Sequence, residues 1–202
     1  MGNNNFERKL PIGYREAKRI DAQSSRTAVI LNLVGLVIMA LVLVFTCLPI
    51  FLDGKASVEN GGFWIWLAVF ASLVAYIVLH ELVHGAAYKL TTGEKLTFGI
   101  SLTCAFCGVP KIYTYRKTAL FAVLAPFVLF SVLLVGALVI AYFVNIGLYF
   151  VLAFVLANHV GGCVGDLYVG GLLLFKYKDN SVLMNDTGPK MTFFVKDAEE
   201  KS

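Results

Sequence analysis

The sequence has few charged residues, and two long stretches have almost none. Asp, Glu, Lys and Arg make up 15% of the 202 residues, whereas hydrophobic residues make up 58%. No charged residue occurs from Thr27 to Leu52, and Asp166 is the only one from Thr118 to Phe175. This composition excludes an ordinary soluble domain and predicts an integral membrane protein with one integrated domain.

The sequence also lacks the signs of a disulfide framework and of a cleavable signal peptide. Cys47 and Cys163 lie in apolar stretches, where they are expected to be small core residues. Cys104 and Cys107 have the spacing of half a zinc ribbon, but no second pair follows, and a turn with two reduced thiols is the preferred interpretation. The first apolar run is too long for a signal peptide and should remain as an anchor.

The apolar stretches have the lengths of four transmembrane helices. A hydrocarbon core of about 30 Å requires roughly 20 apolar residues in a helix. Glycines are frequent in the last stretch, which therefore also allows a bent or partly unwound helix. We predict a membrane domain over residues 27–175, with spans at about 27–52, 63–90, 118–143 and 148–175 and a break at 145–147.

The 91–117 loop between the second and third spans has the pattern of a β-hairpin. Apolar and polar residues alternate over 96–103, and 109–115 is a weaker candidate strand after a turn at 104–108. The predicted fold class is therefore an all-α membrane protein with four transmembrane helices and a small β-hairpin at the cytoplasmic surface. Outside the membrane domain, residues 14–21 are expected to be a solvated face rather than a surface helix. Residues 191–196 are a possible extra strand.

The distribution of positive charge predicts the topology. Of the 17 Lys and Arg residues, Lys55 is the only one in a segment expected on the outer side. Basic loops stay in the cytoplasm, which places the N-terminal arm (1–26), the 91–117 loop and the C-terminal tail (176–202) there. Four spans return the chain to its starting side, in agreement with this assignment.

Two histidines and a glutamate follow the apolar run of the second span, in the order His80-Glu81-Leu82-Val83-His84. On a helix the two imidazoles share one face and can bind one metal ion, while Glu81 can take a proton from water. This short pattern also occurs by chance. Ionisable side chains at membrane depth are costly, however, and three of them within five residues favour a functional site.

Asp166 is the candidate for a third metal ligand, because catalytic zinc usually takes three protein ligands. His80 is nine residues from Lys89 and Asp166 is ten from Lys176, each at the cytoplasmic end of its span. At about 1.5 Å per residue the two side chains are nearly level in the membrane. A structural hydrogen-bonding group, or half of an ion pair with a lysine, is the alternative role for Asp166.

Two neighbouring polar residues precede Asp166 on the fourth span. His159 is about 10 Å from Asp166 along a regular helix, so a hydrogen-bonding role beside the site is preferred over metal ligation. Asn158 could orient a peptide carbonyl or satisfy a nearby backbone group.

These residues resemble the motifs of site-2-protease-like intramembrane zinc metalloproteases. The chain is most similar to the bacterial four-span membrane proteins called putative zincin peptidases, over roughly residues 27–175. The similarity lies in His80–His84, in the strand beginning at Leu96, in Leu124-Ala-Pro-Phe127, and in Asn158 and Asp166 with their spacing of eight.

The resemblance implies a zinc metalloendopeptidase. Zn²⁺ would be held by His80, His84 and Asp166, with Glu81 as general base and Asn158 as an accessory group that orients the substrate. The partners would be the lipid bilayer and a membrane-embedded or membrane-adjacent protein or peptide, cut near the cytoplasmic face, and no nucleic acid. The expected location is the bacterial cell membrane, with both termini cytoplasmic.

A non-catalytic metal-binding scaffold (a pseudoprotease) or a divalent-ion carrier is the alternative function. A carrier needs polar groups along a path to both faces. The outer half of the spans offers little beyond Ser72 and the turn at Asn145, which counts against transport.

Overall fold

The computed structural model describes residues 5–54, 62–101 and 105–197. The chain forms two compact units. The first unit contains Met1–Val29, Glu81–Ala125 and Asp166–Ser202, and the second contains Ile30–His80 and Pro126–Gly165. Cys104, half of the Cys-x-x-Cys pair, lies outside the described residues.

Within the described residues, four helical stretches are long and apolar enough to cross a membrane. Large apolar side chains such as Phe45 and Phe143 are more than three-quarters exposed on them, as expected for helices that face lipid. The helices are α1 (Ser25–Leu52), α2 (Gly62–Thr92) and α3 (Arg116–Val144), followed by α4 (Ile146–Gly162), α5 (Val164–Gly171) and a π-helical turn (Leu172–Lys176).

The fourth helical stretch is interrupted, as its many glycines allowed. It begins where the sequence predicted a break, because the Asn145 side chain caps α4 by accepting a 2.9 Å hydrogen bond from the Leu148 amide. Cys163 separates α4 from α5, and its amide bonds the carbonyl of His159. Asp166 consequently lies in the first turn of a new short helix.

The described part of the second unit is mostly helical, and one close contact joins α1 to α4. A Cβ atom added to Gly35 would lie 2.6 Å from the carbonyl oxygen of Gly161, and one added to Gly161 would lie 2.5 Å from that of Gly35. Only glycine permits this approach of the two backbones. An apolar core surrounds Tyr149, whose hydroxyl donates a 2.6 Å hydrogen bond to the Thr46 carbonyl.

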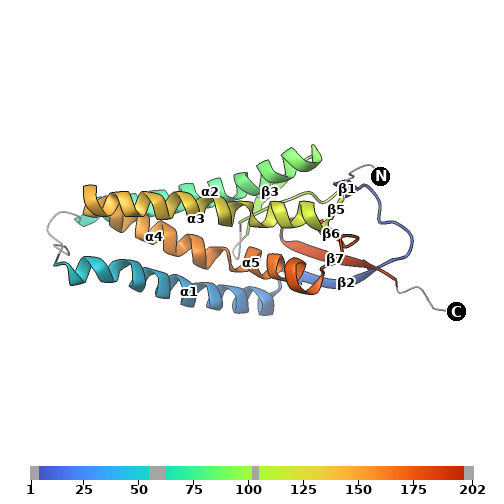
Figure 1. Ribbon diagram of the computed structural model, residues 1–202, viewed down its shortest axis with the longest axis horizontal. Coiled ribbons are helices and arrows are strands. Elements are labelled where there is room, and N and C mark those ends of the chain that lie inside the picture. The colour runs from blue at the N-terminus through green and yellow to red at the C-terminus, as the bar shows by residue number, and fades with distance from the viewer. Residues whose placement is uncertain (1–4, 55–61, 102–104, 198–202) are drawn as a thin grey trace. The chain divides into compact units, whose positions relative to one another are not determined.

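The first unit contains a five-stranded antiparallel sheet, so the predicted all-α class was wrong. The protein is mostly helical, with this sheet added. The strand order is β1-β5-β6-β7-β2, and β2, near the N-terminus, lies beside the C-terminal β7 (Figure 1). The strands are β1 (Phe6–Glu7), β2 (Tyr14–Asp21), β5 (Tyr113–Tyr115), β6 (Leu183–Asp186) and β7 (Lys190–Lys196).

The longest pairing in the sheet joins β2 to β7. Their register runs from Tyr14 opposite Lys196 to Asp21 opposite Lys190, with a bulge between Glu16 and Lys18. Residues 14–21 are therefore a strand instead of an unpaired solvated face, because β7, at the other end of the chain, supplies their backbone hydrogen bonds. The extra strand predicted at 191–196 is confirmed as β7.

The loop after α2 contains a second, two-stranded sheet, which confirms a hairpin but changes its second strand. β3 (Thr97–Ile100) pairs with β4 (Ala105–Gly108), residues that were expected to form the turn. Gly99 lies opposite Phe106, and a Cβ on Gly99 would collide with the Phe106 ring. The missing side chain at Gly99 thus admits the aromatic ring and favours this register.

The apolar face of the five-stranded sheet packs on helical segments of the same unit. Met184 and Phe193 of the sheet are fully buried with Ala119 of α3 and Leu173 of the π turn. This core fixes the start of α3 and the segment after Asp166 around the sheet.

Candidate metal site and its hydrogen-bonded surroundings

The two histidines of the motif lie one turn apart in the continuous helix α2. His80 and His84 are 8% and 7% exposed, and Glu81 is half-buried. The sequence of α2 favours one long helix, because apart from the motif it is mostly apolar and is uncharged until Lys89 in its last turn. The boundary between the two units falls between His80 and Glu81.

In the first unit, the structure brings His84 and Asp166 together. His84 Nε2 lies 3.5 Å from Asp166 Oδ2. On the other side of the ring, Nδ1 lies 2.9 Å from the Ala122 carbonyl oxygen. A carbonyl can only accept, so His84 Nδ1 carries the proton and donates it. The ring is therefore oriented with Nε2 towards the carboxylate.

In the second unit, Tyr76 joins His80 to His159. The Tyr76 hydroxyl lies 2.9 Å from His80 Nδ1 and 2.7 Å from His159 Nδ1. His159 Nε2 lies 3.0 Å from Ser131 Oγ. Both ring nitrogens of His159 therefore have a hydrogen-bond partner.

Aromatic rings hold His159 in place. The imidazole is fully buried and stacks on Phe127 at 5.7 Å between ring centroids. Tyr76 packs edge-on against both His159 and Phe130. This packing restricts the ring orientations and makes the hydrogen bonds of His159 specific.

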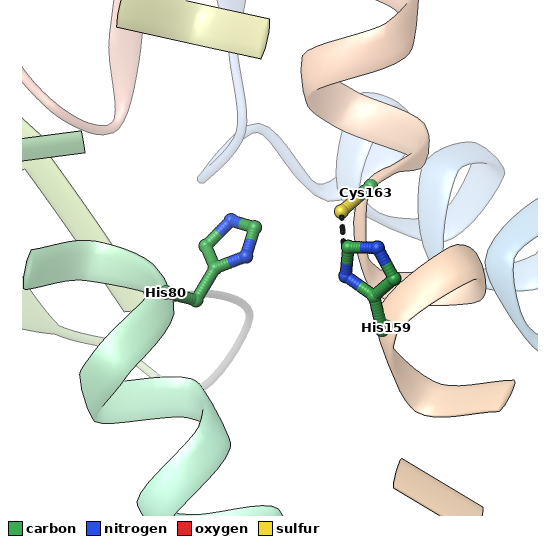
Figure 2. Close-up of side chains that lie close together, drawn as sticks. All are labelled: His80, His159 and Cys163. Carbon is green, nitrogen blue, oxygen red and sulfur yellow. Dashed lines mark hydrogen bonds between the residues drawn. The ribbon is translucent and has the colours of Figure 1, made fainter. Parts of the chain in front are cut away.

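His80, His159 and Cys163 form a buried group that could hold a metal ion. Their candidate ligand atoms all lie within 4.8 Å of one another. Figure 2 shows His80 on α2 facing His159 and Cys163, with a hydrogen bond of 3.5 Å between Cys163 Sγ and His159 Nδ1. Cys163 is fully buried, as expected for a core residue, but it also has this polar contact.

Sequence reasoning missed Tyr76 and Ser131. Tyr76 precedes His80 by four residues, so helical spacing alone could have placed its hydroxyl near the imidazole. Ser131 gives no such signal, because its partner His159 is on another helix. Asn158 is half-buried on α4 beside His159, and its proposed role stays a prediction.

The strand β3 lies against α2 directly after the motif. A Cβ on Gly85 would come within 2.7 Å of the Phe98 ring and 3.1 Å of Leu96 Cδ1. Glycine at this position therefore admits the two side chains. Phe98, which lies beside Gly85, is 48% exposed, and Ile100 is 82% exposed, so β3 has accessible apolar side chains.

Comparison with known proteins connects this part of the chain to a family. The model of the family described as "Putative zincin peptidase" matches residues 73–182, which is 110 of the 202 residues and includes His80, His84 and Asp166. No curated protein matches the chain. No solved structure matches it.

Proposed function

The chain belongs to the family described as "Putative zincin peptidase", and from this premise we propose that it is a zinc-dependent intramembrane peptidase related to site-2 proteases. Its substrate is a membrane-embedded or membrane-adjacent polypeptide, cut near the cytoplasmic face. The observation that carries the proposal is the 3.5 Å approach of His84 Nε2 to Asp166 Oδ2. These two proposed ligands come from helices far apart in the sequence.

The donor set fits a zinc ion. Two imidazole nitrogens and one carboxylate oxygen are typical ligands of catalytic zinc. A metal-bound histidine usually donates its other N–H to a carbonyl or carboxylate, and His84 has this arrangement with the Ala122 carbonyl. His80 has its Nδ1 at a hydroxyl instead, that of Tyr76.

In the proposed reaction His80, His84 and Asp166 hold the ion. Bound zinc supplies positive charge that polarises a carbonyl and makes water more acidic. Glu81 takes a proton from the attacking water and passes it to the leaving amine. Glu81 directly follows His80 on α2, and this adjacency supports its assignment as the base.

The strand β3 is the proposed substrate-binding element. A helical substrate must be extended before its peptide bonds can be cut, and an extended chain can add to the edge of a sheet. The exposed side chain of Ile100 and the contact of Phe98 with α2 beside Gly85 support this assignment. Asn158 is proposed to orient a carbonyl of the bound peptide.

The membrane location is part of the proposal. Helices long and apolar enough to span a bilayer support an integral multi-pass protein. We place it in a bacterial cell membrane with both termini in the cytoplasm, on the basis of the positive charges at both ends of the chain.

A non-catalytic metal-binding scaffold is the second candidate. It is favoured by the buried group of His80, His159 and Cys163, which could bind a metal ion without using Glu81. The two candidates differ in whether Glu81 is required for turnover.

The test compares purified wild type with Glu81→Gln, which keeps the shape of the side chain but removes its basicity. Zinc content is measured first, then cleavage of candidate membrane substrates. A peptidase requires both proteins to bind zinc and only wild type to cut. Equal cleavage by both would show that Glu81 is not the general base. Zinc binding without cleavage by either would favour the scaffold.

A further inference from the structure

The two histidines of the motif have their Nδ1 atoms held by chemically different partners. His84 Nδ1 faces the carbonyl oxygen of Ala122, which can only accept. His80 Nδ1 faces the hydroxyl of Tyr76, which can donate or accept. The Ala122 carbonyl therefore fixes the protonated nitrogen of His84, whereas the protonated nitrogen of His80 depends on what else Tyr76 contacts.

Tyr76 has one proton and two imidazole neighbours. If it donates that proton to His159 Nδ1, then His80 Nδ1 must donate to the Tyr76 oxygen, and His80 Nε2 carries a lone pair. If it donates to His80 Nδ1, then His80 Nε2 carries the proton and is unable to bind a metal ion. The hydrogen-bond direction at Tyr76 thus decides whether His80 is a competent ligand.

His159 connects this choice to Ser131. An imidazole that accepts at Nδ1 has its proton on Nε2, and His159 Nε2 lies 3.0 Å from Ser131 Oγ, which can accept it. The Cys163 thiol, 3.5 Å from His159 Nδ1, can donate weakly to the same lone pair. Both neighbours are compatible with a lone pair on Nδ1 of His159.

We propose that Tyr76, His159 and Ser131 form a positioning chain that holds His80 with its proton on Nδ1, so that Nε2 presents a lone pair to the metal. This inference rests on the proposed function, because it assigns His80 as a ligand. In this positioning chain His80 Nδ1–H donates to the Tyr76 oxygen, the Tyr76 hydroxyl donates to His159 Nδ1, and His159 Nε2–H donates to Ser131.

The same contacts weigh against a metal ion held by the Nδ1 atoms of both His80 and His159 together with Cys163. The Tyr76 oxygen lies 2.9 Å and 2.7 Å from the two Nδ1 atoms and 4.0 Å from Cys163 Sγ. A cation bound to both Nδ1 atoms and the thiolate would have to displace this hydroxyl. Tyr76 is only 6% exposed, so its hydroxyl would then need another buried partner.

The test uses Tyr76→Phe, with Tyr149→Phe as a matched control. Tyr149 is also a buried tyrosine of the second unit, but its hydroxyl bonds the Thr46 carbonyl and contacts no histidine. The first readout is zinc affinity by competition with a chelator. We expect Tyr76→Phe to bind zinc roughly 10- to 100-fold more weakly, as when other hydrogen-bond partners of metal-bound histidines are removed. Tyr149→Phe should bind zinc as wild type does.

The second readout needs no metal. The chain has three histidines, so ¹⁵N-histidine labelling gives a small set of ring-nitrogen signals that report which nitrogen carries the proton. In metal-free wild type we expect His80 to be protonated at Nδ1. Tyr76→Phe should give a mixture of both tautomers. Ser131 is the last member of the positioning chain, so Ser131→Ala is a smaller change. It should give a mixture of tautomers at His159 and weaken zinc binding less.

The outcomes separate this inference from the peptidase proposal. Unchanged zinc affinity and an unchanged His80 tautomer in Tyr76→Phe would overturn the positioning chain alone. A sulfur-to-cobalt absorption band that disappears in Cys163→Ala would overturn it in favour of the cysteine-containing site. Weaker zinc binding by Tyr76→Phe with no cleavage by wild type would support the positioning chain and reject the peptidase proposal. No zinc binding by wild type would overturn both.

Discussion

The Tyr88 hydroxyl donates a 2.6 Å hydrogen bond to Oδ2 of Asp186, and both side chains are buried. Tyr88 lies on α2 one turn after His84, and Asp186 is the last residue of β6. The other carboxylate oxygen of Asp186 accepts from the Gly188 amide at 2.8 Å. Asp186 therefore links the sheet to the helix segment that carries His84.

Removing the Tyr88 hydroxyl should destabilise the fold. Tyr88→Phe leaves the buried Asp186 carboxylate without one donor, and a cost of about 1–3 kcal/mol is expected for such a group. Tyr115→Phe is the control, because its partner Glu7 is only partly buried and water can replace the lost hydroxyl. Denaturant unfolding in detergent measures the difference, and equal losses in both variants would contradict the assigned role.

The same carboxyl group should make stability depend on pH. Burial raises the pKa of Asp186 from 3.8 to about 6, although the hydrogen bonds from Tyr88 and Gly188 oppose the increase. The folded state then binds the proton more tightly than the unfolded state. The contribution of Asp186 is full below about pH 4 and is lost as the pH rises through about 6.

Unfolding of metal-free wild type and Asp186→Asn between pH 4 and 7 measures this contribution. The difference in unfolding free energy between the two proteins should change across that range, with wild type losing stability relative to the variant as the pH rises. Parallel curves would show that Asp186 titrates equally in the folded and unfolded states.

Asp166→Ala should lose zinc while the fold remains. The variant removes the carboxylate that lies 3.5 Å from His84 Nε2. Asp179→Ala is the control, since Asp179 is an exposed acid of the same unit. Metal analysis of the purified variants, with circular dichroism to check folding, tests the prediction. Full zinc content in Asp166→Ala would show that another group supplies the third ligand, with His159 the first candidate.

Gly85→Ala should impair substrate handling more than metal binding. The added methyl would meet the Phe98 ring at 2.7 Å and Leu96 Cδ1 at 3.1 Å, so these side chains must move from their positions against α2. Gly136→Ala is the control, because nothing lies within 4 Å of its added Cβ. We expect slower cleavage of membrane substrates by Gly85→Ala at unchanged zinc content. Unchanged cleavage would argue against β3 as the substrate strand.

The sequence predicted the helices well because long apolar runs allow few structures other than a helix. A chain that crosses lipid must satisfy its backbone internally, so long uncharged runs indicate helices without knowledge of tertiary contacts. Asn145 is a recognisable helix cap. The motif from His80 to His84 was equally visible, because its geometry depends only on helical spacing.

The sheet and the hydrogen-bond chain were not predictable in the same way. β2 carries charges of both signs and gains its strand conformation from β7, at the opposite end of the chain. Tyr76 and Ser131 gain their roles from His159 on another helix. Such contacts between distant residues leave no periodic pattern in the sequence.

The close approach of α1 and α4 gives a prediction with an adjacent control. Gly161→Ala would place a methyl 2.5 Å from the Gly35 carbonyl oxygen and 2.9 Å from Met39 Cβ. Backbone atoms of both helices would have to move, and overpacking of this kind typically costs about 1–3 kcal/mol. Gly162→Ala adds the same methyl one residue later, where nothing lies within 4 Å.

Thermal unfolding of the two variants in detergent measures this difference. Gly161→Ala should unfold at a lower temperature than wild type, and Gly162→Ala should not. His159, two residues before Gly161 on α4, should also shift in ¹⁵N spectra of Gly161→Ala, because the same helix carries both. Equal stability of the two variants would show that α1 and α4 can separate without loss, and that the glycine contact does not hold His159 in its place.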